Sequence, residues 1–164
     1  MTDALVAFLK ARLDEDERAA RRAGDTFRQI GETGVIVATE GDRAEECASA
    51  NWSGIAEHIV RQDPARTLRE VEAKRQLLDA ALADHHHISA DQYETCPRAT
   101  AADGLDANTL AALEDLNEER RQEYGVEPQC WESCGRDARV RRTLELLALP
   151  YSNHPGYEEA LTGG

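Results

Sequence analysis

The chain has 164 residues, of which 32 are acidic and 19 are lysine or arginine, giving a net charge of −13. This charge opposes attraction to phosphate backbones and disfavours direct binding to nucleic acid. The apolar runs are far shorter than the roughly 18–20 residues that span a bilayer, and the N-terminal segment lacks a basic leader, so we expect a soluble cytoplasmic protein.

The first predicted element is a helix that Thr2 can cap. Its apolar residues Leu5, Leu9 and Leu13 recur at four-residue steps, which places them on one helical face. Gly24 is the expected stop.

A β-meander is predicted next, from three β-prone pieces at 26–30, 35–38 and 44–49 that glycine-containing turns separate. Such a sheet needs a helix to cover its apolar face, and Phe27, Ile36 and Trp52 are the expected contacts.

Four further helices are expected. A short one starts at Ser53 and buries Ile55 and Ile59, and a long one follows the Asp63-Pro64 cap and runs to Ala83. The others span about 108–124 and 135–149, and the segment 151–157 is expected to fold back on the core as a C-terminal cap.

Together these elements predict an α+β fold that is predominantly helical, with about four main helices and a small antiparallel meander near 26–49. We expect a single domain over 1–164. Its parts are 1–83 with the meander, an acidic helical segment at 84–128 that is a candidate insertion, and 129–164 with a cysteine pair. Residues 84–125 concentrate the negative charge, with ten acidic and three basic side chains.

The cysteines suggest a metal site. In a reducing cytoplasm Cys96, Cys130 and Cys134 are expected to be thiols or metal ligands and not disulfides. Cys130 and Cys134 have three residues between them, within the two to four usual for paired zinc ligands. Cys96 and one histidine of the run at 85–87, for which we choose His87, complete a predicted Cys3His structural zinc site. The alternative is that the cysteines are small buried hydrophobes and the histidines are solvated.

A second constellation is weaker. His58, Asp63 and Arg66 surround the turn into the long helix, where they suit either an acid–base site or a helix cap with a polar network. No phosphate loop, nucleophile elbow or zinc-protease motif occurs in the sequence.

Several segments carry a resemblance to a known family: AFLKARLDEDE (7–17), EHIVRQDPAR (57–66), EVEAKR (70–75), CGRDARV (134–140), LALPY (147–151) and HP (154–155). The chain resembles a family of unknown function among short actinobacterial and actinophage proteins. The resemblance implies a phage or mobile-element setting, with a faint similarity to small phage accessory proteins. In some relatives it implies a paired-cysteine zinc-ribbon-like feature, for which this chain has CxxxC in place of CxxC.

The function expected from these observations is a non-catalytic interaction module, an accessory protein that binds an unidentified protein partner and carries one structural zinc. One alternative is a small metal-dependent hydrolase. Another is an acidic decoy for a basic, nucleic-acid-handling protein, which would require one exposed face to gather acidic residues of the middle segment: Asp103, Glu114, Asp115, Glu118 and Glu119.

Overall fold

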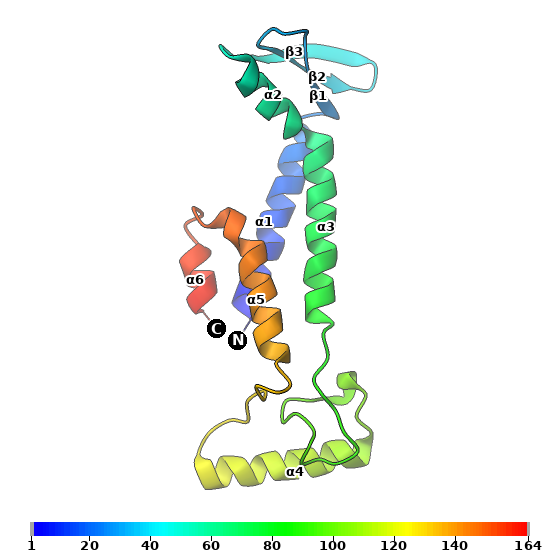
Figure 1. Ribbon diagram of the computed structural model, residues 1–164, viewed down its shortest axis with the longest axis vertical. Coiled ribbons are helices and arrows are strands. Elements are labelled where there is room, and N and C mark those ends of the chain that lie inside the picture. The colour runs from blue at the N-terminus through cyan, green and yellow to red at the C-terminus, as the bar shows by residue number, and fades with distance from the viewer. Residues whose placement is uncertain (1, 164) are drawn as a thin grey trace. The chain divides into compact units, whose positions relative to one another are not determined.

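The computed structural model describes residues 2–163, and over this range it contains six α-helices and one three-stranded antiparallel sheet (Figure 1). The α+β class is confirmed. The helix count exceeds the four main helices expected, because the short helices α2 (Ser53–Arg61) and α6 (Tyr157–Thr162) add to them. Among the described residues no helix has the length and apolar character needed to cross a membrane.

The described chain divides into two compact units. Unit 1 contains the residues up to Leu78 and those from Leu147 onward, whereas unit 2 is Asp79–Leu146. The helices α3 (Pro64–Leu82) and α5 (Arg136–Ala148) each continue from one unit into the other.

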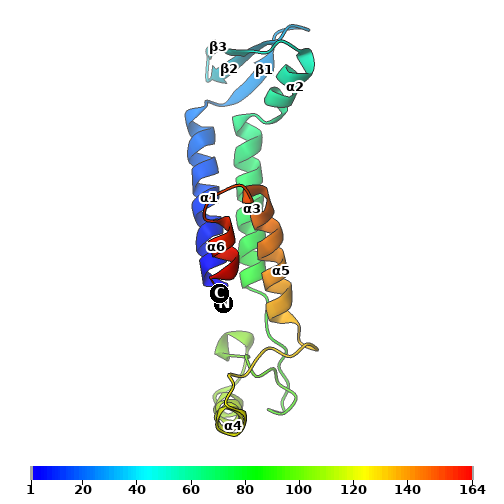
Figure 2. The same cartoon turned by 90° about the vertical axis from the view of Figure 1, so that its left-hand side faces the viewer.

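Two long helices, α1 (Asp3–Arg22) and α3, form the centre of unit 1 and lie side by side in both views (Figures 1 and 2). The predicted apolar stripe is the buried one: Leu9 and Leu13 of α1 lie beside Leu78 of α3. Arg75 of α3 adds ion pairs of 2.6 Å to Asp14 and 2.7 Å to Glu17 of α1. Apolar burial therefore joins the two helices, and these ion pairs add at most a small stabilisation.

The predicted meander is present as β1 (Thr26–Gln29), β2 (Val35–Glu40) and β3 (Arg43–Ser49), with a register shift between Ile36 and Val37. Ile36 is fully buried, as expected.

Two other expectations for this region are wrong, because Trp52 is 73% exposed and Ile55 is 42% exposed. Trp52 is the extended N-cap residue of α2, and Ala56 is the buried residue of that helix. Ile55 precedes Ala56 and is turned about 100° away from it around the helix axis.

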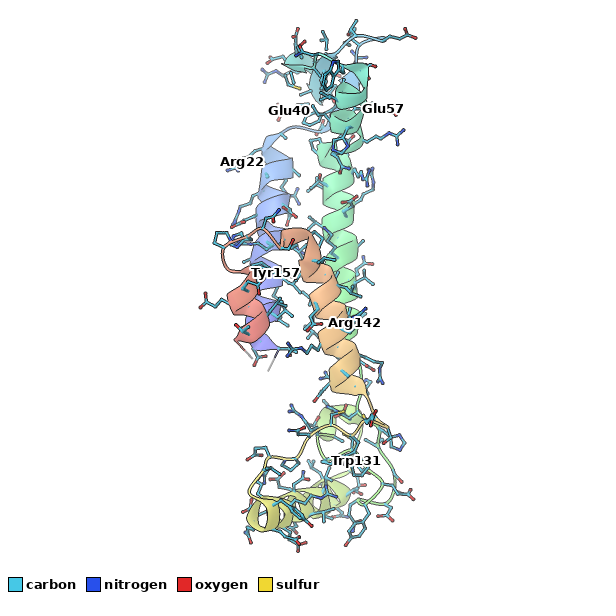
Figure 3. All side chains as sticks on the ribbon, turned by 60° about the vertical axis from the view of Figure 1, so that its left-hand side comes forward. Arg22, Glu40, Glu57, Trp131, Arg142 and Tyr157 are labelled. Atoms are coloured by element: carbon cyan, nitrogen blue, oxygen red, sulfur yellow. The ribbon has the colours of Figure 1, made fainter. Side chains whose placement is uncertain are left out.

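The C-terminal segment folds back onto α1 within unit 1. Tyr151, in the 3₁₀ helix η2 (Leu149–Tyr151), and Tyr157, at the start of α6, each meet the Phe8 ring edge-on, at centroid distances of 6.4 and 6.3 Å. His154 lies closer to Phe8, at 5.5 Å, and also contacts Arg12. Tyr157 is labelled in Figure 3.

Unit 2 contains α4 (Ala107–Tyr124), the 3₁₀ helix η1 (Ala101–Asp103) and most of α5. Asp106 caps α4 by accepting hydrogen bonds from the N–H groups of Asn108 and Thr109. Gly125 ends it in the left-handed conformation, with φ of 67°, which favours glycine. Apart from η1, the segments 83–106 and 125–135 of unit 2 are mostly loops and turns.

Candidate metal centre

Four potential metal ligands converge inside unit 2. The ligand atoms of His86, Cys96, Cys130 and Cys134 all lie within 4.8 Å of one another. Cys96 is fully buried, His86 and Cys134 are at most 9% exposed, and Cys130 is half-buried. The four come from two segments, His86 and Cys96 from the one after α3 and Cys130 and Cys134 from the one before α5, so the tertiary fold brings them together.

The distances from His86 to two of the thiols fit a tetrahedral ion. Zinc bonds of about 2.3 Å to sulfur and about 2.05 Å to nitrogen, meeting at about 109°, put the two ligand atoms about 3.5 Å apart. His86 Nδ1 lies 3.4 Å from Cys96 Sγ and 3.7 Å from Cys134 Sγ. These four residues could therefore hold a metal ion without large rearrangement.

The histidine of the cluster is His86, and the expectation of His87 is corrected. The main chain of His87 is engaged on both sides: its N–H donates to Cys134 Sγ at 3.2 Å, and its carbonyl accepts from the Cys96 N–H at 3.0 Å. The His86 ring enters the cluster, whereas the His87 side chain is exposed.

Backbone N–H groups surround two of the thiols. Cys96 accepts from the N–H of Arg98 and Cys134 from that of Arg136, in each case from the second residue after the cysteine. The two loops read Cys-Pro-Arg and Cys-Gly-Arg, and Gly135 takes a φ of 64° that favours glycine. This repeated Cys-x-Arg pattern is a sequence signal that links Cys96 to Cys134 and that the spacing argument missed.

The thiols differ in acidity. Burial raises the pKa of Cys134. Hydrogen bonds from the N–H groups of His87 and Arg136, together with the contacts with His86 and Cys130, lower it by more, so that the pKa is about 6. Burial raises the pKa of the Cys96 thiol to about 11, against the lowering effect of its N–H donors. A side-chain hydrogen bond with Cys134 and the charge of Cys130 contribute to this raised pKa.

A carboxylate lies on the other side of the His86 ring. Nε2 of His86 lies 3.6 Å from Asp137 Oδ1, opposite the nitrogen that faces the thiols. Arg136 and Arg98 hold Asp137 with ion pairs of 3.1 and 3.4 Å. A carboxylate on the second ring nitrogen is the usual support of a metal-bound histidine.

Asp103 holds the His86 backbone. Its Oδ1 accepts from the His86 N–H at 2.8 Å, and its Oδ2 accepts from the Thr100 N–H at 2.8 Å. The Asp103 side chain is 7% exposed. Burial raises its pKa, but these hydrogen bonds lower it more, so the pKa is below its ordinary value.

The apolar surroundings of the cluster are small. Besides the cysteines, the buried members of this core are Ala99 and Leu113, with Leu105 and Trp131 packed partly buried against them. Trp131, labelled in Figure 3, lies 6.0 Å from the Arg120 guanidinium of α4. Asn117, also on α4, donates to the Pro97 carbonyl at 2.8 Å.

The second constellation forms a helix cap. Asp63 Oδ1 accepts from the Arg66 N–H at 2.7 Å, and the Arg66 side chain pairs with Glu70 at 2.6 Å. His58 is exposed on α2. No described hydrogen bond or ion pair joins His58 to Asp63 or Arg66.

Four of the five acidic residues named for the decoy hypothesis lie on the exposed side of α4: Glu114, Asp115, Glu118 and Glu119. Their spacing puts them within about 140° of the helix circumference. Asp103 does not join them, because its side chain is buried beside His86.

Comparison with known proteins identifies a family. The model of a family of unknown function (DUF6221) matches residues 2–162, and the chain belongs to that family. No curated protein and no solved structure matches the chain.

Proposed function

We propose that this member of the DUF6221 family is a non-catalytic interaction module whose unit 2 is held together by a structural zinc ion on His86, Cys96, Cys130 and Cys134. The observation that carries the proposal is the convergence of four ligand atoms within 4.8 Å. The proposal places the protein in a reducing cytoplasm, where thiols remain available as ligands.

The ligand set favours zinc. Three thiolates and one imidazole form the Cys3His combination of structural zinc sites, whereas magnesium and calcium require oxygen ligands. Copper(I) and iron also accept thiolates, so the metal itself is an outcome of the experiment below.

The small core explains why a metal is needed. Ordering the backbone costs about 1–2 kcal/mol per residue, and the loops at 83–106 and 125–135 contain many residues to order. Ala99 and Leu113 are the buried non-cysteine members of the core cluster at this site. Because so little apolar surface is buried there, metal binding is expected to supply a large part of the folding free energy of unit 2.

The number of ligands favours a scaffold over a hydrolase. A catalytic zinc keeps a coordination position open for water, and four protein ligands fill a tetrahedral ion. The His58, Asp63 and Arg66 group offers no alternative metal site, since Asp63 is engaged as a helix cap and His58 points to solvent.

The test is elemental analysis of the purified full chain. Wild type is expected to contain one zinc per chain. Cys130→Ser and Cys134→Ser are expected to lose the metal and to unfold at a lower temperature. Cys47→Ser is the matched control, because Cys47 is an exposed cysteine of β3 outside the cluster.

Two results would contradict the proposal. One is a wild-type protein that carries no metal after expression in zinc-supplemented medium and does not bind zinc when titrated. The other is a stoichiometric metal that both serine variants retain with unchanged thermal stability.

A further inference from the structure

We infer that the thiol cluster is a modification site for hydrogen peroxide, at which Cys130 is oxidised first, forms a disulfide with Cys134 and releases the zinc ion. This inference rests on the proposed function, because it assigns a regulation to the same metal site. Two differences among the three thiols carry it: their exposure, and the hydrogen bonds that their sulfur atoms accept.

Cys130 is the thiol that solvent reaches best. It is half-buried, whereas Cys96 is fully buried and Cys134 is 8% exposed. Its neighbours Gln129 and Glu132 are exposed, so this part of the chain lies at the surface of unit 2. Because oxidation of a cysteine depends on access, a small neutral oxidant meets this sulfur before the other two.

Backbone N–H groups protect the other two thiols. Cys96 accepts from the N–H groups of Arg98 and Trp131, and Cys134 accepts from those of His87 and Arg136. Within residues 2–163 no backbone N–H donates to Cys130, whose own thiol contacts the Trp131 carbonyl at 3.6 Å. A hydrogen bond donated to a thiolate stabilises its charge and makes it a weaker nucleophile. Cys130 therefore has the most reactive sulfur of the three.

Cys134 is placed to complete a disulfide. The side chains of Cys130 and Cys134 are in contact, with their sulfur atoms within 4.8 Å of each other. They flank a turn that the Gly135 N–H closes on the Trp131 carbonyl at 2.8 Å. The sulfurs must approach to about 2.05 Å in a disulfide, and this movement is confined to one turn. A bond to Cys96 would have to join two separate segments.

The reaction consumes one peroxide for each disulfide. The Cys130 thiolate attacks one oxygen of hydrogen peroxide and breaks the O–O bond, which gives a sulfenic acid and hydroxide. The Cys134 thiolate then attacks the sulfenic sulfur, forms the S–S bond and expels a second hydroxide. Solvent protons convert both hydroxides to water. The two thiolates together lose two electrons, and the peroxide gains them.

The oxidised cluster can no longer hold the ion. Disulfide sulfurs are not thiolate ligands, so two of the four ligands are lost and only His86 and Cys96 remain. Because the buried non-cysteine members of this core are Ala99 and Leu113, unit 2 should loosen when the ion leaves. A thiol reductant reverses the step by returning both sulfurs to thiolates.

The experiment treats the reduced, zinc-loaded full chain with hydrogen peroxide and follows free zinc with a chromophoric indicator. The expected result is release of the bound zinc together with a Cys130–Cys134 disulfide, mapped by peptide mass spectrometry. A brief exposure should show Cys130 oxidised before Cys96, an assignment that needs no change to the ligands. Dithiothreitol followed by zinc should restore the loaded protein.

Matched variants keep a zinc ligand and remove a thiol. Cys130→His supplies an imidazole and should slow zinc release about tenfold, because the accessible sulfur is gone. Cys134→His removes the thiol that closes the disulfide, so the sulfenic acid at Cys130 should persist and react with dimedone. Cys47→Ser is the control and should release zinc at the wild-type rate, since Cys47 is exposed but lies outside the cluster.

Three results would each overturn the inference. They are zinc release that peroxide does not accelerate, first oxidation at Cys96, and a zinc-loaded Cys130→His protein as sensitive as wild type. A zinc-loaded chain that resists peroxide refutes the modification site and leaves the structural metal intact. A chain that binds no zinc refutes the proposed function, and with it the inference.

Discussion

The imidazole of His86 lies between the thiols and Asp137, with Nδ1 3.4 Å from Cys96 Sγ and Nε2 3.6 Å from Asp137 Oδ1. The two ring nitrogens thus have separate tasks. One faces the proposed metal, and the other faces a carboxylate, the usual partner of a metal-bound histidine.

Substituting the two adjacent histidines is expected to give opposite results. His86→Ala removes a ligand, so zinc affinity should fall by more than the roughly 10–100-fold typical of losing an outer-shell partner. His87→Ala keeps the backbone N–H that donates to Cys134, so affinity should stay within about threefold of wild type. Competition with a chromophoric chelator measures both. Equal losses in the two variants would contradict the assignment of His86.

Asp137→Asn should lower zinc affinity by about 10–100-fold, because a neutral amide supports the His86 ring less firmly and raises the basicity of Nδ1 less than a carboxylate does. Asp115→Asn, an exposed carboxylate on α4, is the control and should have no measurable effect on zinc affinity. An Asp137→Asn protein with wild-type affinity would show that the carboxylate only pairs with Arg98 and Arg136.

Removing the metal should loosen unit 2 before unit 1. Hydrogen exchange of the chelator-treated chain is expected to show lost protection in α4, because its attachment to the loops depends on the cluster around Cys96. Protection in α1 should persist, since Leu9 and Leu13 pack with Leu78 in a separate apolar core. Adding back zinc should restore α4. Simultaneous loss in both helices would mean that the metal supports the entire fold.

Tyr151 is expected to make unit 1 sensitive to alkaline pH. Two causes raise the pKa of Tyr151 above its ordinary value of 10.0. Burial is the larger, and the hydrogen bond to Asp16 at 2.6 Å is the second. The folded state therefore holds this proton more tightly than the unfolded state. The stabilisation that protonated Tyr151 gives the folded state is present below pH 10 and decreases as the pH rises above that value.

Urea unfolding of wild type and Tyr151→Phe from pH 8 to pH 11 tests this. At pH 8 the variant should be less stable by about 1 kcal/mol, the usual worth of one hydrogen bond. The difference should shrink above pH 10. Tyr93→Phe, at a tyrosine that is 64% exposed, should follow wild type throughout. A constant difference across this range would exclude Tyr151 as the titrating group.

The sequence by itself determined the local elements. The spacing of Leu5, Leu9 and Leu13 predicted the buried face of α1, and the turns around 31–34 and 40–42 predicted the meander, because helix periodicity and turn formation depend on neighbouring residues. The same local information named three cysteines that converge in the cluster, although their roles as ligands remain predictions.

The tertiary structure alone decided which histidine joins them. Three consecutive histidines have the same chemistry, and the choice of His86 depends on how the His87 main chain bonds to Cys96 and Cys134, residues 9 and 47 positions away. Burial of Ala56 in place of Ile55 was decided in the same way, by the face that α2 turns toward its surroundings. Such choices arise from contacts between distant segments, which local periodicity does not contain.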